Sequence, residues 1–258
     1  MKRIIFIGLI IAGLFTVLPL FAQSSSSESV RNSLGDLDSQ FVKIPGKNYS
    51  MFKTEMTQKI YELVMEENPS EFSGSSLPVE NVSWYDAVYF CNKLSIIMGK
   101  EPVYSFDGET NPLNWPYEPH NPMYNLDMIE DEIEMNKNAN GYRLPTQSEW
   151  EYAANGGAKF KYSGGNTLSS VAWYYDNSNF MTHKVGSKKA NGYGLFDMSG
   201  NVWEWCWDAN KNSLFNDYVR GGCCEDTEDM CRISYKYAYY GYDSYGYDYR
   251  GFRPVMNN

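Results

Sequence analysis

The side chains best suited to metal or covalent chemistry in this chain are its cysteines and histidines. They are Cys91, Cys206, Cys223, Cys224, Cys231, His120 and His183. No two of the cysteines have the CxxC spacing of a zinc site, and the two histidines are far apart, so zinc sites and three-histidine iron sites are poorly supported. The odd number of cysteines leaves at least one unpaired within the chain.

A second candidate for chemistry is the segment 197–204, which reads DMSGNVWE. Its two carboxylates, Asp197 and Glu204, flank a turn that contains a glycine. Carboxylate and carbonyl oxygens are the ligands that Ca²⁺ prefers, so this turn is a candidate calcium site. The alternative is a turn held by hydrogen bonds alone.

Tyrosines are concentrated near the C-terminus. The chain has 22 Tyr, and 8 of them fall within the 19 residues 232–250, which read RISYKYAYYGYDSYGYDYR. Tyr gives a large contact area at low entropic cost, while Ser, Gly and Asp give adaptable hydrogen bonding. This composition is typical of a recognition surface. The alternatives are a fixed ligand-binding loop, or inert or disordered low-complexity structure.

The genetic code gives a second interpretation of the same region. Changing the adenines of an Asn codon yields Tyr, Asp, Ser, Gly, Cys and Ala, but not Glu, Gln, Met, Trp or Lys. Every residue of 237–249 is reachable in this way, as are Cys223 and Cys224. We therefore predict a diversified region at about residues 223–249. Its candidate ligand contacts are Cys223, Cys224, Asp226, Tyr237, Tyr239, Tyr240, Tyr242, Asp243, Tyr245, Tyr247, Asp248 and Tyr249.

Charge and the N-terminus indicate the setting. The chain has 22 Lys+Arg and 32 Asp+Glu, a net charge of -10, which disfavours nucleic acid as a partner because phosphate backbones are repelled. Lys2 and Arg3 precede an apolar run over 4–18, which predicts a signal peptide over 1–22, cleaved after Ala22. An uncleaved anchor is the alternative. We expect an exported protein, in the periplasm or on the outer cell surface.

The elements that position these residues follow from caps and turn signals. Residues 23–40 are Ser-rich and predict a flexible leader, with one domain over 41–258. Thr57, Ser83 and Thr146 are predicted N-caps of three helices. Asp86 and Glu149 complete capping boxes after the second and third caps, and the first helix is expected to end near Asn68. Short segments after residue 157 predict brief strands, so the fold class is α+β.

Two further features suggest packing roles. Arg143 stands beside a turn and a helix cap, where we expect it to pair with a carboxylate or with carbonyls. Trp203, Trp205 and Trp207 alternate as a strand would place them on one face, and we expect them to pack in the core.

Five sequence blocks together carry a family resemblance. In chain order they are LPVENVSWYDAVYFCNKLS, GYRLPTQSEWEYAANGG, ANGYGLFDMSGNVWEW, VRGG and GFRPV. Over about residues 41–255 the chain resembles the formylglycine-generating-enzyme-type (sulfatase-modifying factor) domain. The resemblance implies a C-type lectin-like fold of that subclass, with much irregular loop.

The resemblance also implies particular ligands for the candidate metal. It places calcium on the side chains of Asp197 and Glu204 and on the carbonyls of Met198, Gly200 and Val202. The oxidase members of the family use a cysteine pair shortly after the RGG motif to bind copper. Here Cys223 and Cys224 directly follow the glycines, and Cys231 resembles the cysteine of non-catalytic members. Because the oxidase spacing is not reproduced, we expect no copper.

The C-terminal tract adds a closer resemblance, to variable proteins of spirochaetes that are diversified by retroelements. Those proteins share an exported scaffold of this type, and the chain ends in the same GFRPV block. We therefore expect an exported, non-enzymatic, receptor- or adhesin-like monomer that binds a protein or cell-surface ligand. A copper-dependent oxidase and a fixed carbohydrate-binding module are the alternatives.

Overall fold

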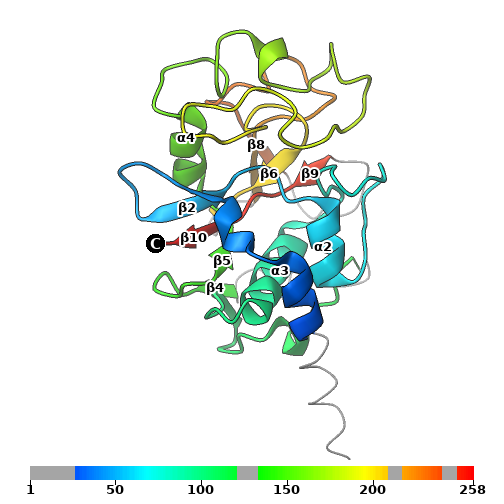
Figure 1. The fold of residues 1–258 in the computed structure, drawn as a ribbon, viewed down its shortest axis with the longest axis vertical. Helices are drawn as coiled ribbons and strands as arrows, with labels where there is room; N and C mark the ends of the chain where they lie inside the picture. Colours follow the sequence, from blue (N-terminus) through cyan, green and yellow to red (C-terminus); the bar gives the residue numbers. More distant parts are fainter. Residues whose placement is uncertain (1–26, 121–132, 209–216, 240–248) are drawn as a thin grey trace, which may run out of the picture.

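The structure is a computed structural model that describes residues 27–120, 133–208, 217–239 and 249–258. Its first sheet joins the two ends of the domain (Figure 1). The strands are β1 (Phe41–Lys43), β2 (Tyr49–Phe52), β10 (Val255–Asn257) and β5 (Tyr142–Arg143), in the order β1-β2-β10-β5. β10 pairs antiparallel with both β2 and β5. The last residues of the chain therefore complete the sheet that the first strands begin.

A second four-stranded sheet carries the C-terminal region. Its strands are β8 (Lys236–Tyr239), β7 (Asp217–Arg220), β6 (Trp203–Trp205) and β9 (Arg250–Gly251), in the order β8-β7-β6-β9. β6 pairs antiparallel with β7 and parallel with β9. The tyrosine tract thus leaves the sheet from one edge strand, β8, and rejoins it at the opposite edge, β9.

Helices and shorter elements surround these sheets. After a helix over residues 27–34, the chain forms helices α2 (Gln58–Met65), α3 (Trp84–Ile97) and α4 (Gln147–Asn155). The described 3-10 turns are η1 (Leu37–Gln40), η2 (Pro112–Asn114) and η5 (Leu168–Ser170). A two-stranded sheet pairs β3 (Tyr104–Phe106) with β4 (Ile133–Met135). The mixture of helices, small sheets and long irregular connections confirms the predicted α+β class.

The helix starts confirm the cap predictions. Thr57 accepts a hydrogen bond from the Ile60 amide, and both predicted capping boxes form, at Ser83 and at Thr146. The first helix ends at Met65, before the predicted Asn68, because Glu66 takes a left-handed conformation (φ 70°) as its C-cap.

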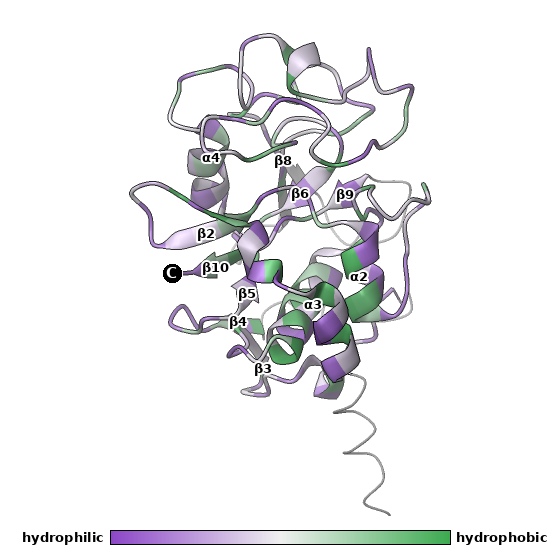
Figure 2. Cartoon of the chain, viewed as in Figure 1, coloured by the Kyte–Doolittle hydropathy of each residue, from purple (hydrophilic) through white to green (hydrophobic). Residues whose placement is uncertain are grey.

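The core lies mainly around α3, most of whose residues are buried. Hydrophobic colouring is strong on α2 and α3 in Figure 2. The Phe90 ring contacts Tyr61 of α2, with ring centroids 5.3 Å apart, and Phe252 near the C-terminus at 5.1 Å. Trp203 and Trp205 are buried as predicted, and Trp207 stacks on Trp84.

The predicted flexible leader is wrong over its described part. Residues 27–34 are helical, and Val30 and Leu34 pack against the core while Leu37 is buried within it. These three apolar residues follow helical spacing, a signal that the Ser-rich composition obscured. Among the helices that the structure describes, none has the length and apolar character needed to cross a membrane.

Candidate functional site

Tyr237, near the start of the tyrosine tract, packs on a buried tryptophan, Trp203. The Tyr237 side chain on β8 is 38% exposed. Its ring centroid lies 6.1 Å from that of Trp203 on β6, and the Tyr235 ring lies 6.0 Å from the same tryptophan. The buried Trp203 ring therefore supports both tyrosine rings on its side of the sheet, while part of Tyr237 faces solvent.

The tyrosine at the end of the tract, Tyr249, is tied down at three points. Its carbonyl accepts a hydrogen bond from the Trp203 amide at 2.7 Å. Its ring stacks on Phe72 at 5.8 Å, and its hydroxyl donates to Glu225 Oε1 at 3.0 Å. Burial, followed by the hydrogen bond to Glu225, raises the pKa of the Tyr249 hydroxyl. This tyrosine therefore links three segments of the surface.

The residues after the double glycine form a turn whose first two side chains face inward. Cys223 and Cys224 are buried. The Asp226 carboxylate accepts from the Cys223 amide at 2.8 Å, and the Asp226 amide donates back to the Cys223 carbonyl at 3.2 Å. This reciprocal pair closes a turn over 223–226, whose Cys224 amide donates to Asn201. In this conformation the two thiols and Asp226 build the turn and leave Glu225 exposed.

The other predicted contacts are placed only in part. Tyr239 belongs to β8, where its backbone pairs with Asp217, and its side chain is outside the described set. The remaining six predicted contacts also lie outside the described residues: Tyr240, Tyr242, Asp243, Tyr245, Tyr247 and Asp248.

Sequence reasoning missed Phe72, which supports Tyr249 from the loop before α3. The backbone of this residue is held on both sides. Its carbonyl accepts from Gln58 Nε2 at 2.6 Å, and its amide donates to Glu80 Oε1 at 3.0 Å. Burial raises the pKa of Glu80 to about 7. A lone aromatic in the polar segment 70–76 was the one available signal in the sequence.

One of the predicted calcium ligands, the Glu204 carboxylate, forms an ion pair with Arg253. Arg253 donates to both oxygens of Glu204, at 2.7 Å from Nη2 to Oε1 and 3.0 Å from Nε to Oε2. The Trp150 indole donates to Oε2 at 2.7 Å. Both members of this ion pair are buried. Glu204 is thus paired with a cation, Arg253, and accepts its hydrogen bonds from groups within the protein.

The rest of the predicted calcium set is only partly arranged for a metal. Asp197 has a left-handed backbone (φ 57°), accepts from the Gly186 amide at 2.6 Å, and buries Oδ1 without a partner among the described residues. Burial raises the pKa of Asp197 to about 6. In the part of the chain that the structure describes, no group of three or more His, Cys, Asp and Glu side chains is placed to hold a metal ion. Glu204 is paired to Arg253, and the calcium site at these residues stays a prediction.

The cysteines are free, buried thiols. Burial raises the pKa of Cys231 and of Cys206, so their reactive thiolate forms are disfavoured. Cys91 belongs to α3 and lies in the core.

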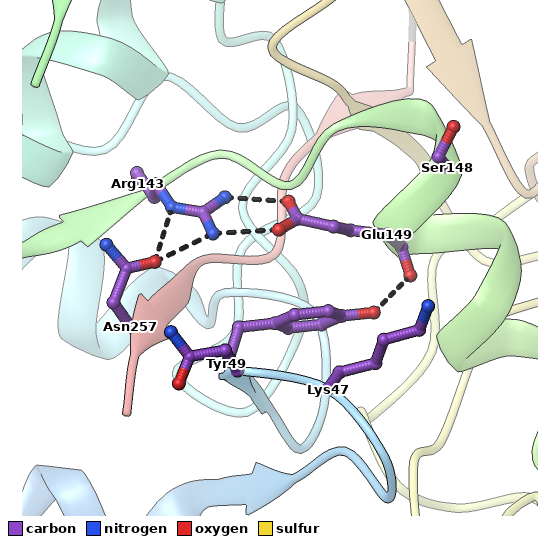
Figure 3. Close-up of a pocket in the computed structure, with 7 residues that line it drawn as sticks. Lys47, Tyr49, Arg143, Ser148, Glu149 and Asn257 are labelled. Atoms are coloured by element: carbon purple, nitrogen blue, oxygen red, sulfur yellow. Dashed lines mark hydrogen bonds and ion pairs between the residues drawn. The ribbon is translucent and has the colours of Figure 1, made fainter. Parts of the chain in front are cut away.

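The surface also has a polar hollow of about 370 Å³ at the edge of the first sheet, shown in Figure 3. Arg143 forms its floor and makes two hydrogen bonds to Glu149, at 2.7 and 2.8 Å, as well as bonds to Asn257 and the Leu144 carbonyl. The Tyr49 hydroxyl donates to the Glu149 carbonyl. The bonds to Glu149 confirm the predicted pairing of Arg143 with a carboxylate. Because Arg143 also binds Asn257, the residues of the hollow connect α4 to the C-terminal strand β10.

Comparison with known families gives one match over most of the chain. The family described as "Sulfatase-modifying factor enzyme 1-like domain" matches residues 38–258. A protein of Paenibacillus barcinonensis named chaperone protein LppX is 45% identical over 207 residues, which are 71% of this chain and 71% of that protein. The formylglycine-generating enzyme of Mycobacterium tuberculosis is 44% identical over 79 residues, but these cover only 25% of this chain and 26% of the enzyme.

Among solved structures, Treponema denticola variable protein 1 is similar with a TM-score of 0.68 and 33% identity, over 85% of this chain and 91% of that chain. A structure titled CarF is similar with a TM-score of 0.64 and 30% identity, over 81% of this chain and 86% of that chain. Together with the family match, these similarities confirm the predicted C-type lectin-like fold of the formylglycine-generating-enzyme type.

Proposed function

The chain belongs to the sulfatase-modifying factor enzyme 1-like domain family and has its C-type lectin-like fold, and from this premise we propose that it is an exported, non-enzymatic binding protein. Its recognition surface comprises the tyrosine tract and the turn over 223–226. The ligand is a protein or cell-surface molecule, bound by a monomer.

One observation carries this proposal: the described tyrosines of the tract are anchored from below. Tyr237 is 38% exposed above the buried Trp203, and Tyr249 is fixed by Phe72 and Glu225. An aromatic side chain that is already held in place gains affinity from burial with little ordering cost. The similarity to Treponema denticola variable protein 1 supports the same role.

The architecture explains how such a surface could vary without loss of the fold. The tract connects β8 and β9, and the residues that hold these strands lie elsewhere in the chain. The β7 backbone pairs with β8, and Trp203 on β6 supports both ends of the tract. Exchange of exposed tract side chains leaves the β7–β8 backbone pairing and the bond from the Trp203 amide to the Tyr249 carbonyl in place.

We also propose that Arg253 supplies the positive charge that compensates the buried Glu204 carboxylate. The buried Glu204 carboxylate accepts hydrogen bonds from both Arg253 and Trp150, which supports this assignment.

The diversification part of the proposal is tested by sequencing the 3′ end of the gene in many cells of one population. We expect substitutions confined to codons 223–249, at bases that derive from adenine. An invariant tract, with no near-copy of the segment beside the gene, would contradict the proposal.

A copper-dependent oxidase is the second candidate, favoured by the partial match to formylglycine-generating enzyme. The buried Cys224 and Cys231 speak against it, because a thiol pair must become thiolate to bind copper. Stoichiometric copper binding that is lost in both Cys224→Ser and Cys231→Ser would support the oxidase instead.

A further inference from the structure

The segment 70–76 lies between the Glu80 side chain and the solvent. Glu80 is fully buried, whereas residues 71, 73, 75 and 76 are exposed. The Oε1 atom of Glu80 accepts a hydrogen bond from the Phe72 amide at 3.0 Å, and the Glu80 amide donates to the Ser70 hydroxyl at 3.1 Å. Glu80 therefore fastens the same segment that covers it.

The described residues give the Glu80 carboxyl group no compensating cation. Its Oε2 atom is buried and has no hydrogen-bond partner among them. Glu71 faces it from the segment 70–76, α2 presents the uncharged Gln58, and Arg250 of β9 lies over the Trp205 ring. Burial, together with Glu71, raises the pKa of Glu80 to about 7. The uncharged acid is thus the form that this site favours.

The segment that Glu80 fastens also supports the end of the tyrosine tract. The Phe72 ring stacks on Tyr249 with an interplanar angle of 18°, and Gln58 Nε2 donates to the Phe72 carbonyl at 2.6 Å. Glu71 contributes to the raised pKa of Tyr249 as well, so its charge acts on both groups. A displacement of the segment 70–76 would therefore withdraw the ring that packs against Tyr249.

We propose that Glu80 makes the support of Tyr249 dependent on pH. The protonated carboxyl group keeps the segment 70–76 closed, with Phe72 against Tyr249. An ionised carboxylate without a cation needs water, and because the segment covers Oε2, hydration requires the segment to open. The inference rests on the proposed function and adds its regulation: the recognition surface is better organised in mildly acidic surroundings than above neutral pH.

The sign of the effect follows from the pKa of Glu80 in the two forms of the segment. In the open form Glu80 is hydrated and ionises near its ordinary pKa of 4.5, whereas in the closed form its pKa is about 7. The contribution of Glu80 to closure is therefore complete below the first value and is lost as the pH rises through the second. Between them closure takes up a proton, so its equilibrium constant falls by up to about tenfold per pH unit.

Hydrogen exchange of the Phe72 amide tests the inference, because this amide leaves Glu80 when the segment opens. We expect its protection factor, which corrects for the intrinsic exchange rate, to fall about tenfold between about pH 5.5 and 7.5. The Trp150 amide in α4 reports global opening and should change less. Glu80→Gln keeps an acceptor oxygen but cannot ionise, so its Phe72 protection should stay within about twofold. The matched control is Glu71→Gln, an exposed neighbour, which should keep the fall.

Peptides selected from a random phage-displayed library on the wild-type protein, at about pH 5.5, connect the opening to binding. Binding that requires Tyr249 in place weakens in proportion to the closed fraction. We expect such peptides to bind at least about twofold more weakly at about pH 7.5 to the wild type, but not to Glu80→Gln.

The outcomes separate this inference from the proposed function. If the Phe72 protection of the wild type does not change with pH, or falls equally in Glu80→Gln, the inference fails and the proposed function stands. If protection falls but peptide affinity does not, Glu80 does not regulate the surface and the inference fails as well. Peptide binding that is unaffected in both Tyr237→Ser and Tyr249→Ser would contradict the proposed function instead.

Discussion

Replacing Arg253 with methionine is expected to destabilise the folded protein by about 3–5 kcal/mol, the usual cost of breaking a buried ion pair. Arg253 is completely buried and donates to Glu204 and to the carbonyls of Phe52 and Phe196. Methionine fills much of the space but leaves the Glu204 carboxylate buried without its cation. The loss of that charge compensation dominates the effect.

Urea denaturation of Arg253→Met, Glu204→Gln and the double variant measures this cost. We expect the double variant to lose less than the sum of the two single losses, because the unpaired charge is gone. Arg232→Met is the control: Arg232 forms a partly exposed pair with Asp229, and its loss should cost less than about 1 kcal/mol. A similarly small cost for Arg253→Met would show that another group neutralises Glu204.

Replacing Gly200 with alanine is expected to cost more than about 4 kcal/mol and to leave little folded protein. A Cβ at this position would lie 2.1 Å from the Trp173 carbonyl oxygen, on a backbone with φ of +77°. That carbonyl accepts from the Asn201 amide, and the Asn201 carbonyl in turn accepts from Cys224 in the turn over 223–226. The substitution therefore disrupts the support of the recognition surface.

Gly194→Ala separates the clash from the backbone conformation. Gly194 also has a positive φ, +85°, but a Cβ there meets nothing within 4 Å. We expect it to cost about 1–2 kcal/mol, the ordinary penalty of a left-handed alanine. Circular dichroism and thermal unfolding of the two variants give the comparison. Equal stability of the two variants would contradict the close approach of Gly200 to Trp173.

Local signals in the sequence predicted the starts of three helices and the pairing of Arg143 with a carboxylate. The caps Thr57, Ser83 and Thr146 act over three residues, so the pattern of residue types is sufficient. Arg143 was expected to pair at the helix entrance, and its partner Glu149 lies only six residues away. The resemblance of five blocks predicted the C-type lectin-like fold.

Features that depend on contacts between distant segments were not predictable in this way. The partner of Glu204 is Arg253, 49 residues later, and nothing in the 197–204 segment distinguishes that pairing from a calcium site. Phe72 and Tyr249 meet across 177 positions of the sequence. The codon pattern predicts Cys223 and Cys224 as contacts, but it carries no information on burial, and both side chains face inward.

The central claim, a constant scaffold with an exchangeable recognition surface, is tested most directly by selecting a library for binding to several unrelated proteins. The randomised positions are 237, 239, 240, 242, 243, 245, 247, 248 and 249. We expect each target to select a different tract on molecules whose melting temperatures stay within a few degrees of the parent. Loss of the folded state in most of the library, or the same tract selected by every target, would contradict the claim.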